Sequence, residues 1–221
     1  MYSSSITAII SAVRALFGNR RSLLLMLVVY TGLLAAIYLF VSTREATVSQ
    51  LLLTLVTVIV APVLFFVLQA AIVTNGPGLV KTSFKLFVVT VPVLAATVVA
   101  MYGLNKVQTH PTIVTTVRYI LLAVIVPLLM IQLWIAVSNS GMRVRNMLTR
   151  AFAPQSVFVY TFGFLIFAVV PYLLLHKTIS IERPWLEMSV LLLRLALSAV
   201  LIFLGWVTTV STLSILSVKR T

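Results

Sequence analysis

Long apolar runs, rather than an alternation of polar and apolar residues, dominate this chain. Six stretches of 20 residues or more contain no Lys, Arg, Asp or Glu, and they cover 22–43, 46–80, 86–105, 119–142, 151–176 and 195–218. About 20 apolar residues are enough for a helix to cross the hydrocarbon core of a membrane. A backbone in lipid must satisfy its own hydrogen bonds, so each stretch is a helix or a barrel strand. The apolar run Leu23–Val29 does not alternate as a barrel strand would.

We therefore predict an all-α polytopic membrane protein with six transmembrane helices. The predicted helices are 22–42, 49–74, 86–104, 117–138, 157–176 and 187–217. The first apolar run is longer than the core of a signal peptide, which is about 7–15 residues, and no A-x-A cleavage site follows it. We expect this first helix to stay in the protein.

The N-terminal segment 1–19 has a different pattern, that of an amphipathic helix. Its apolar residues recur at helical spacing, and they are Ile6, Ile9, Ile10, Val13, Leu16 and Phe17. The segment is too short to span, and Gly18 and Asn19 are common residues at helix ends. We predict an interfacial helix over 1–19, followed by a six-helix bundle over 20–221. The alternative is a plain cytoplasmic extension of the first span.

Composition supports a membrane protein and argues against other classes. Hydrophobic residues make up 62% of the chain and the mean hydropathy is +1.19, which is too apolar for a soluble fold of this size or for a disordered chain. The net charge is +13. In a soluble protein this charge would suggest nucleic acid, but here we expect cationic anchors at the membrane surface and no nucleic-acid partner.

The charged residues divide unequally between the two ends of the predicted helices. One side carries ten basic residues and no acid, namely Arg14, Arg20, Arg21, Lys81, Lys85, Arg143, Arg145, Arg150, Lys219 and Arg220. The other side carries six basic residues and all three acids, Glu45, Glu182 and Glu187. The positive-inside rule places the first side in the cytoplasm, so we expect a bacterial inner-membrane protein with both termini cytoplasmic. The first eight basic residues of that side are our candidates for contact with anionic lipid or a partner.

A few polar side chains fall within or near the spans. Arg194 has two interpretations: it could lie two turns inside the last helix and reach Glu187, or it could sit at the outer interface, since 195–216 can span alone. We favour the interface. Gln69 and Gln132 lie deeper, and each is predicted to form one interhelical hydrogen bond. The small-residue pairs Gly32/Ala36 and Ala96/Ala100 would let helices approach closely.

Two segments, 62–76 and 127–141, resemble each other at an offset of 65 residues. The matches include Pro62/Pro127 and Gly76/Gly141, and both segments enter a basic turn. An offset of two spans would make a parallel repeat of helical hairpins. Chance similarity between two apolar helices is an equal alternative. The predicted helices two to five each contain one proline, Pro62, Pro92, Pro127 and Pro171, which can line a path or simply kink a packed helix.

The residue types that membrane-embedded catalysis needs are missing. The chain has no Asp or Cys, and its two histidines, His110 and His176, stand alone near the predicted outer side. No P-loop occurs, and no carboxylate falls in the middle of a span, as ion-coupled transport usually requires. We therefore expect no enzyme activity, no cofactor and no metal site.

The opening Arg14-Ala-Leu-Phe-Gly-Asn-Arg-Arg-Ser-Leu-Leu-Leu25, an amphipathic arm that enters the first span, resembles two groups of proteins. One comprises uncharacterised bacterial six-helix membrane proteins, related to the membrane domain of some glycerophosphodiester phosphodiesterases. The other comprises the permease subunits of exporter-type ABC transporters. Those permeases usually carry an acidic coupling segment after the second span, whereas 75–85 contains no acid, which argues against coupling to an ATPase.

Two functional hypotheses follow. The first is a non-catalytic accessory or scaffold subunit that binds membrane lipids and other membrane subunits. The second is a permease-type subunit or small-solute carrier without ion coupling. A polar cavity that reaches the middle of the membrane would favour the second.

Overall fold

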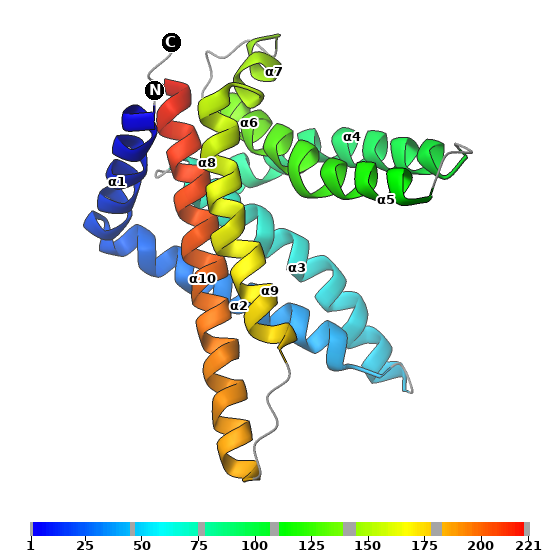
Figure 1. Ribbon diagram of the computed structural model, residues 1–221. Coiled ribbons are helices and arrows are strands. Elements are labelled where there is room, and N and C mark those ends of the chain that lie inside the picture. The colour runs from blue at the N-terminus through cyan, green and yellow to red at the C-terminus, as the bar shows by residue number, and fades with distance from the viewer. Residues whose placement is uncertain are drawn as a thin grey trace. The chain divides into compact units, whose positions relative to one another are not determined.

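The computed structural model describes residues 2–44, 47–74, 78–106, 111–138, 145–177 and 183–218, and these contain helices and no strand (Figure 1). The helices are α1 (Tyr2–Gly18), α2 (Arg20–Ser42), α3 (Val48–Thr74), α4 (Leu79–Lys106), α5 (Pro111–Ile120), the π-helix η1 (Leu121–Ile125), α6 (Val126–Ser138), α7 (Arg145–Ala151), α8 (Pro154–Phe164), the π-helix η2 (Leu165–Val169), α9 (Val170–His176) and α10 (Pro184–Val218). The all-α prediction is confirmed.

Six helices are long and apolar enough to cross a membrane, and the chain is an integral membrane protein. They are α2, α3, α4, the continuous helix α5–η1–α6, the continuous helix α8–η2–α9, and α10. Each has at least 23 residues, with a mean hydropathy of 2.2–2.9 in its most apolar window. A shorter apolar helix, α1, precedes them, as the sequence predicts.

Several helices begin earlier than the charge pattern indicates. The predicted start of the third span at residue 86 is wrong, because α4 begins at Leu79 and includes Lys81 and Lys85. Lysine can keep its aliphatic stem along a helix while its ammonium group reaches water, so a charge does not end a membrane helix. Proline suits the first helical position, where its missing N–H costs no hydrogen bond. The fourth, fifth and sixth spans each begin at such a proline, namely Pro111, Pro154 and Pro184.

The break between α1 and α2 lies at the predicted place. Helix α1 ends at Gly18, and Asn19 caps α2 by accepting a 3.2 Å hydrogen bond from the Ser22 N–H on its side-chain oxygen. The buried face of α1 differs from the predicted apolar face. Ser5, Ala8, Ala12 and Leu16 are buried, whereas the bulkier apolar side chains between them are mostly exposed. The small-residue face of α1 is therefore the packed one.

The chain divides into two compact units, which we name the central unit (16–151) and the terminal unit (1–15 with 152–221). In the central unit α2 packs on α3, α3 on α4, and α4 on α6. Its most deeply buried side chains include Leu86, Leu128, Ile131, Trp134 and Ile135. In the terminal unit α10 packs along α8, η2 and α9, and the core includes Tyr160, Val207, Val210 and Leu213.

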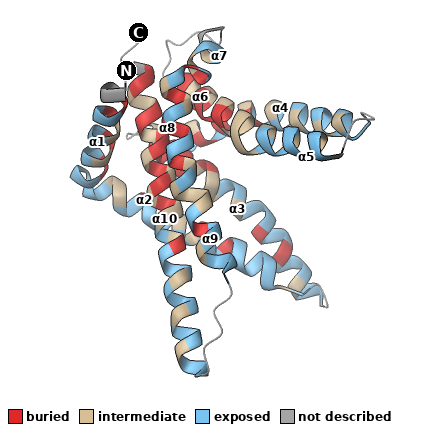
Figure 2. Ribbon diagram, viewed as in Figure 1, coloured by how far each residue is buried: buried red, intermediate tan, exposed pale blue. Residues whose placement is uncertain are grey.

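Burial in α4, α6 and α10 is concentrated toward the helix ends that adjoin the basic connections (Figure 2). In α4 no residue after Thr90 is buried, and in α10 no residue before Ser198 is buried. The opposite halves of these two helices present apolar side chains that the described part of the chain does not cover.

The two π-helical segments stand directly before prolines. The residue that precedes Pro127, Val126, donates its N–H to the Leu121 carbonyl, and the residue that precedes Pro171, Val170, donates to the Leu165 carbonyl. Proline cannot donate a helical hydrogen bond, and its ring clashes with the carbonyl four residues before it. The wider turn of a π-helix accommodates the missing bond and the clash. The helices around Pro62 and Pro92 have no such segment.

The helices that the proposed hairpin repeat relates, α4 and α7, differ in length. The repeat offset of 65 residues maps Leu79, where α4 begins, onto residue 144, and α7 begins at Arg145. However, α7 ends at Ala151 and the chain turns, whereas α4 continues through Phe87. The duplication remains a prediction.

Candidate functional site

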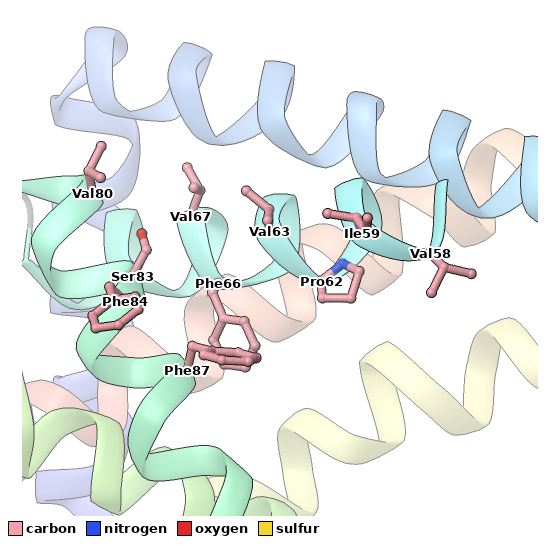
Figure 3. A pocket seen from close by; sticks show the side chains of 10 residues that line it. All are labelled: Val58, Ile59, Pro62, Val63, Phe66, Val67, Val80, Ser83, Phe84 and Phe87. Atoms are coloured by element: carbon pink, nitrogen blue, oxygen red, sulfur yellow. The ribbon is translucent and has the colours of Figure 1, made fainter. Parts of the chain in front are cut away.

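The central unit has an apolar groove between α3 and α4, with a volume of about 550 Å³ (Figure 3). The residues that line it are Val58, Ile59, Pro62, Val63, Phe66, Val67, Val80, Ser83, Phe84 and Phe87. Figure 3 shows Val80, Ser83 and Phe84 at one end and Val58 and Ile59 at the other. We call this hollow the α3–α4 groove.

The floor of the groove is an aromatic contact between its two helices. The Phe66 and Phe87 rings meet edge to face with centroids 5.5 Å apart, and Phe66 is buried. The rim is open, since Ile59, Val63 and Phe84 are exposed. The groove is therefore a half-open apolar channel that faces the surroundings of the chain.

The groove has one polar lining residue, Ser83, and its hydroxyl is already engaged. It donates a 2.6 Å hydrogen bond to the Leu79 carbonyl of the same helix. Such bonding back to the helix is common for hydroxyls in membrane helices. The groove thus offers no free side-chain donor to a polar solute, and its chemistry suits an alkyl chain.

Two exposed lysines lie on the N-terminal part of α4, at the same end of the helix as the groove residues Val80 and Phe84. Val80, Ser83, Phe84 and Phe87 lie at helical spacing on one face. Lys81 follows Val80 in the sequence and Lys85 follows Phe84. The two lysines are one helical turn apart, and both are exposed. Helix α4 begins after Gly78, whose φ of 102° is unfavourable for any residue with a Cβ.

The other predicted basic contact residues belong to α1, α2 and α7 or lie outside the described residues. Arg14 is exposed on α1, and Arg20 and Arg21 are exposed at the start of α2. Arg145 begins α7 and Arg150 is half-buried on it. Arg143 lies outside the described residues.

The predicted intramembrane polar residues have distinct surroundings. Gln69 on α3 and Gln132 on α6 are both fully buried in the central unit. The Gln132 Oε1 has no hydrogen-bond partner among the described residues. The interhelical bond of this side chain stays a prediction. Arg194 is half-exposed and donates through Nη2 to the backbone carbonyl of Lys177, at the C-terminal end of α9, rather than to Glu187.

A second arginine makes a similar link in the central unit. The Arg118 Nη2 on α5 donates to the Asn105 side-chain oxygen near the end of α4. Both arginines therefore tie neighbouring helices together at the ends away from the basic connections.

Two close helix contacts were not predicted from the sequence. The buried Trp134 indole donates to the Thr90 hydroxyl across α6 and α4. In the terminal unit, a Cβ on Gly163 would collide with Thr209, and one on Gly205 would lie 2.9 Å from the Phe167 Cβ. For Gly163 and Gly205, the signal in the sequence was a glycine inside an apolar run, which is typical of close helix packing in membranes.

The predicted small-residue pairs behave differently. Ala36 is buried, and a Cβ on Gly32 would contact Leu64 at 3.4 Å, so the first pair packs α2 on α3. Ala96 and Ala100 are both exposed on α4. The described residues therefore leave that second pair uncovered.

No protein family, no curated protein and no solved structure matches this chain.

Proposed function

We propose that this protein is a non-catalytic accessory or scaffold subunit of a membrane complex in the bacterial inner membrane, with both termini in the cytoplasm. The observation that carries the proposal is the uncovered half of α4, where no residue after Thr90 is buried. This half contains the exposed small-residue pair Ala96/Ala100. Small residues at this spacing let a second membrane helix approach closely, so we propose that a partner subunit packs here.

The character of the buried polar groups supports a packing role. In the central unit Gln69, Thr90 and Gln132 are buried and uncharged. The most buried apolar residues of α4 and α6 lie close in sequence to Thr90 and Gln132. Membrane helices use such uncharged groups to hold their neighbours, whereas ion-coupled transport usually needs a carboxylate in the membrane.

The orientation proposal rests on the excess of basic residues described above. It places Lys81, Lys85 and Arg150 at the cytoplasmic surface, where anionic lipids attract cations at about 1 kcal/mol for each residue. Acidic partner surfaces would be attracted in the same way.

Photo-crosslinking in native membranes tests the scaffold proposal. A photoreactive residue at Ala100 should give a discrete protein adduct, and Ala96→Leu in the same chain should weaken that adduct because the partner helix can no longer approach. A photoreactive residue at Tyr172, exposed on α9, is the matched control and should not respond to Ala96→Leu. Lipid adducts alone at Ala100 would contradict the proposal.

A permease or small-solute carrier is the second candidate, and the π-helical segments before Pro127 and Pro171 favour it, because π-bulges are frequent at functional sites. In proteoliposomes this candidate requires solute flux that changes in Pro127→Ala and Pro171→Ala. Fluxes equal to those of protein-free liposomes would leave the scaffold proposal in place.

A further inference from the structure

We propose that the α3–α4 groove binds an anionic phospholipid, with one acyl chain along the groove and the phosphate between Lys81 and Lys85. The inference deepens the proposed function, because it rests on the proposed cytoplasmic position of these lysines and names a ligand for them.

The length of the groove fits an acyl chain that enters from the surface. The groove begins beside Val80, in the first turn of α4, and its lining on α3 runs from Val67 to Val58. At about 1.5 Å per residue, this part of α3 is about 14 Å long. One leaflet of a bilayer is about 15 Å deep in hydrocarbon, so the lined length matches the depth of one leaflet.

The lining distinguishes an acyl chain from a polar solute. Nine of the ten lining residues carry no polar side-chain atom, and the tenth, Ser83, donates its hydroxyl to the Leu79 carbonyl. The branched side chains of α3 and the Phe66–Phe87 pair all line the groove, so a bound chain would contact side chains of two helices. The surface of a single helix in lipid would contact an acyl chain on one side only.

The charges favour an anionic headgroup. Lys81 and Lys85 are one helical turn apart, exposed, and adjacent in sequence to the groove residues Val80 and Phe84. The chain has no acidic residue between Glu45 and Glu182, so this stretch supplies no carboxylate that could pair with them. The N-terminal end of α4 adds the positive end of its macrodipole at the same place. A phosphodiester complements these groups.

The test is native mass spectrometry of the full-length protein, titrated with phosphatidylglycerol or phosphatidylcholine of identical acyl chains. We expect the wild type to bind phosphatidylglycerol roughly tenfold more tightly, since each nearby cation contributes about 1 kcal/mol before screening. Lys81→Gln/Lys85→Gln should remove this preference. Arg44→Gln/Lys106→Gln removes the same charge from exposed residues of the same unit that are not among the candidate lipid contacts and should keep it.

A second pair of variants tests the groove itself. Val63→Trp fills the groove and should weaken binding of both lipids, whereas Val56→Trp should not, because Val56 has the same 55% exposure on α3 but does not line the groove. Circular dichroism should show all four variants equally helical.

Three results would overturn the proposal. Equal affinity of the wild type for the two lipids would remove the headgroup site. Equal effects of the two charge variants would show attraction to net charge alone. If Val63→Trp dissociated a dimer and left lipid binding unchanged, the occupant would be a second copy of the chain. None of these results depends on the partner crosslink at Ala100, so the lipid site and the scaffold role can fail separately.

Discussion

The indole N–H of Trp134 donates a 2.9 Å hydrogen bond to the hydroxyl of Thr90, which links α6 to α4 inside the central unit. Both residues are buried. The Thr90 hydroxyl donates its own proton to the Leu86 carbonyl at 2.7 Å, so it accepts and donates at once. The Trp134 ring also meets Phe65 of α3 edge to face, with centroids 5.9 Å apart. One side chain therefore connects three transmembrane helices.

Removing either partner of this hydrogen bond should destabilise the protein modestly. We expect Trp134→Phe and Thr90→Val each to lower the free energy of unfolding, with a coupling energy of about 0.6–1 kcal/mol between them in a double-mutant cycle. Unfolding in mild detergent, followed by circular dichroism, measures these values. Thr97→Val is the control, because the Thr97 hydroxyl donates to the Val93 carbonyl of its own helix rather than to a neighbouring helix. Strict additivity of the two substitutions would show that the bond contributes nothing.

A methyl group at Gly163 should separate α8 from α10. The new Cβ would lie 3.0 Å from the Thr209 Cβ and closer still to its hydroxyl, and Thr209 is buried. We expect Gly163→Ala to cost about 1–3 kcal/mol, as overpacking usually does.

Trimming the opposing side chain should recover part of this loss. In Gly163→Ala/Thr209→Ala the colliding hydroxyl is absent, so the double variant should be more stable than Gly163→Ala alone. Gly103→Ala is the matched control within a helix, because a methyl group added there would meet no described atom within 4 Å. Thermal unfolding of the four proteins decides the matter, and a Gly163→Ala variant as stable as Gly103→Ala would rule out the close contact.

Arg194 should hold the C-terminal end of α9 in place. Without its bond to the Lys177 carbonyl, we expect the backbone amides of the last turn of α9 to exchange with deuterium several-fold faster, which corresponds to about 1 kcal/mol. Arg194→Gln tests this by hydrogen–deuterium exchange mass spectrometry. Arg183→Gln removes an exposed arginine from the same side and should leave that exchange unchanged. Identical exchange in the two variants would refute the anchoring role.

The sequence predicted the helices well because the surrounding lipid imposes a simple rule. A helix in hydrocarbon needs a long run without charges, so the six spans could be identified from the gaps between Lys, Arg and Glu. The same rule failed at Leu79, because the lysines at 81 and 85 continue the helix into the interface.

Contacts between helices were harder to predict. The Trp134–Thr90 bond joins residues 44 positions apart, and it depends on how α4 and α6 rotate about their axes. A membrane helix carries apolar residues on all of its faces, so no hydrophobic periodicity distinguishes the face that packs on a neighbouring helix. The burial of Ser5, Ala8 and Ala12, rather than the larger residues of α1, shows the same difficulty. The α3–α4 groove was missed for this reason too, although Lys81 and Lys85 at its end were identified.

Cysteine labelling tests most directly whether the chain crosses the membrane six times with its basic ends in the cytoplasm. The chain has no cysteine of its own, so Thr149→Cys on α7 and Ser189→Cys on α10 each create a single thiol at an exposed residue. With a membrane-impermeant maleimide, Ser189→Cys should react in intact spheroplasts, and Thr149→Cys should react only in inverted membrane vesicles. Reaction of both thiols from the same side of the membrane would contradict the six-span topology and its orientation.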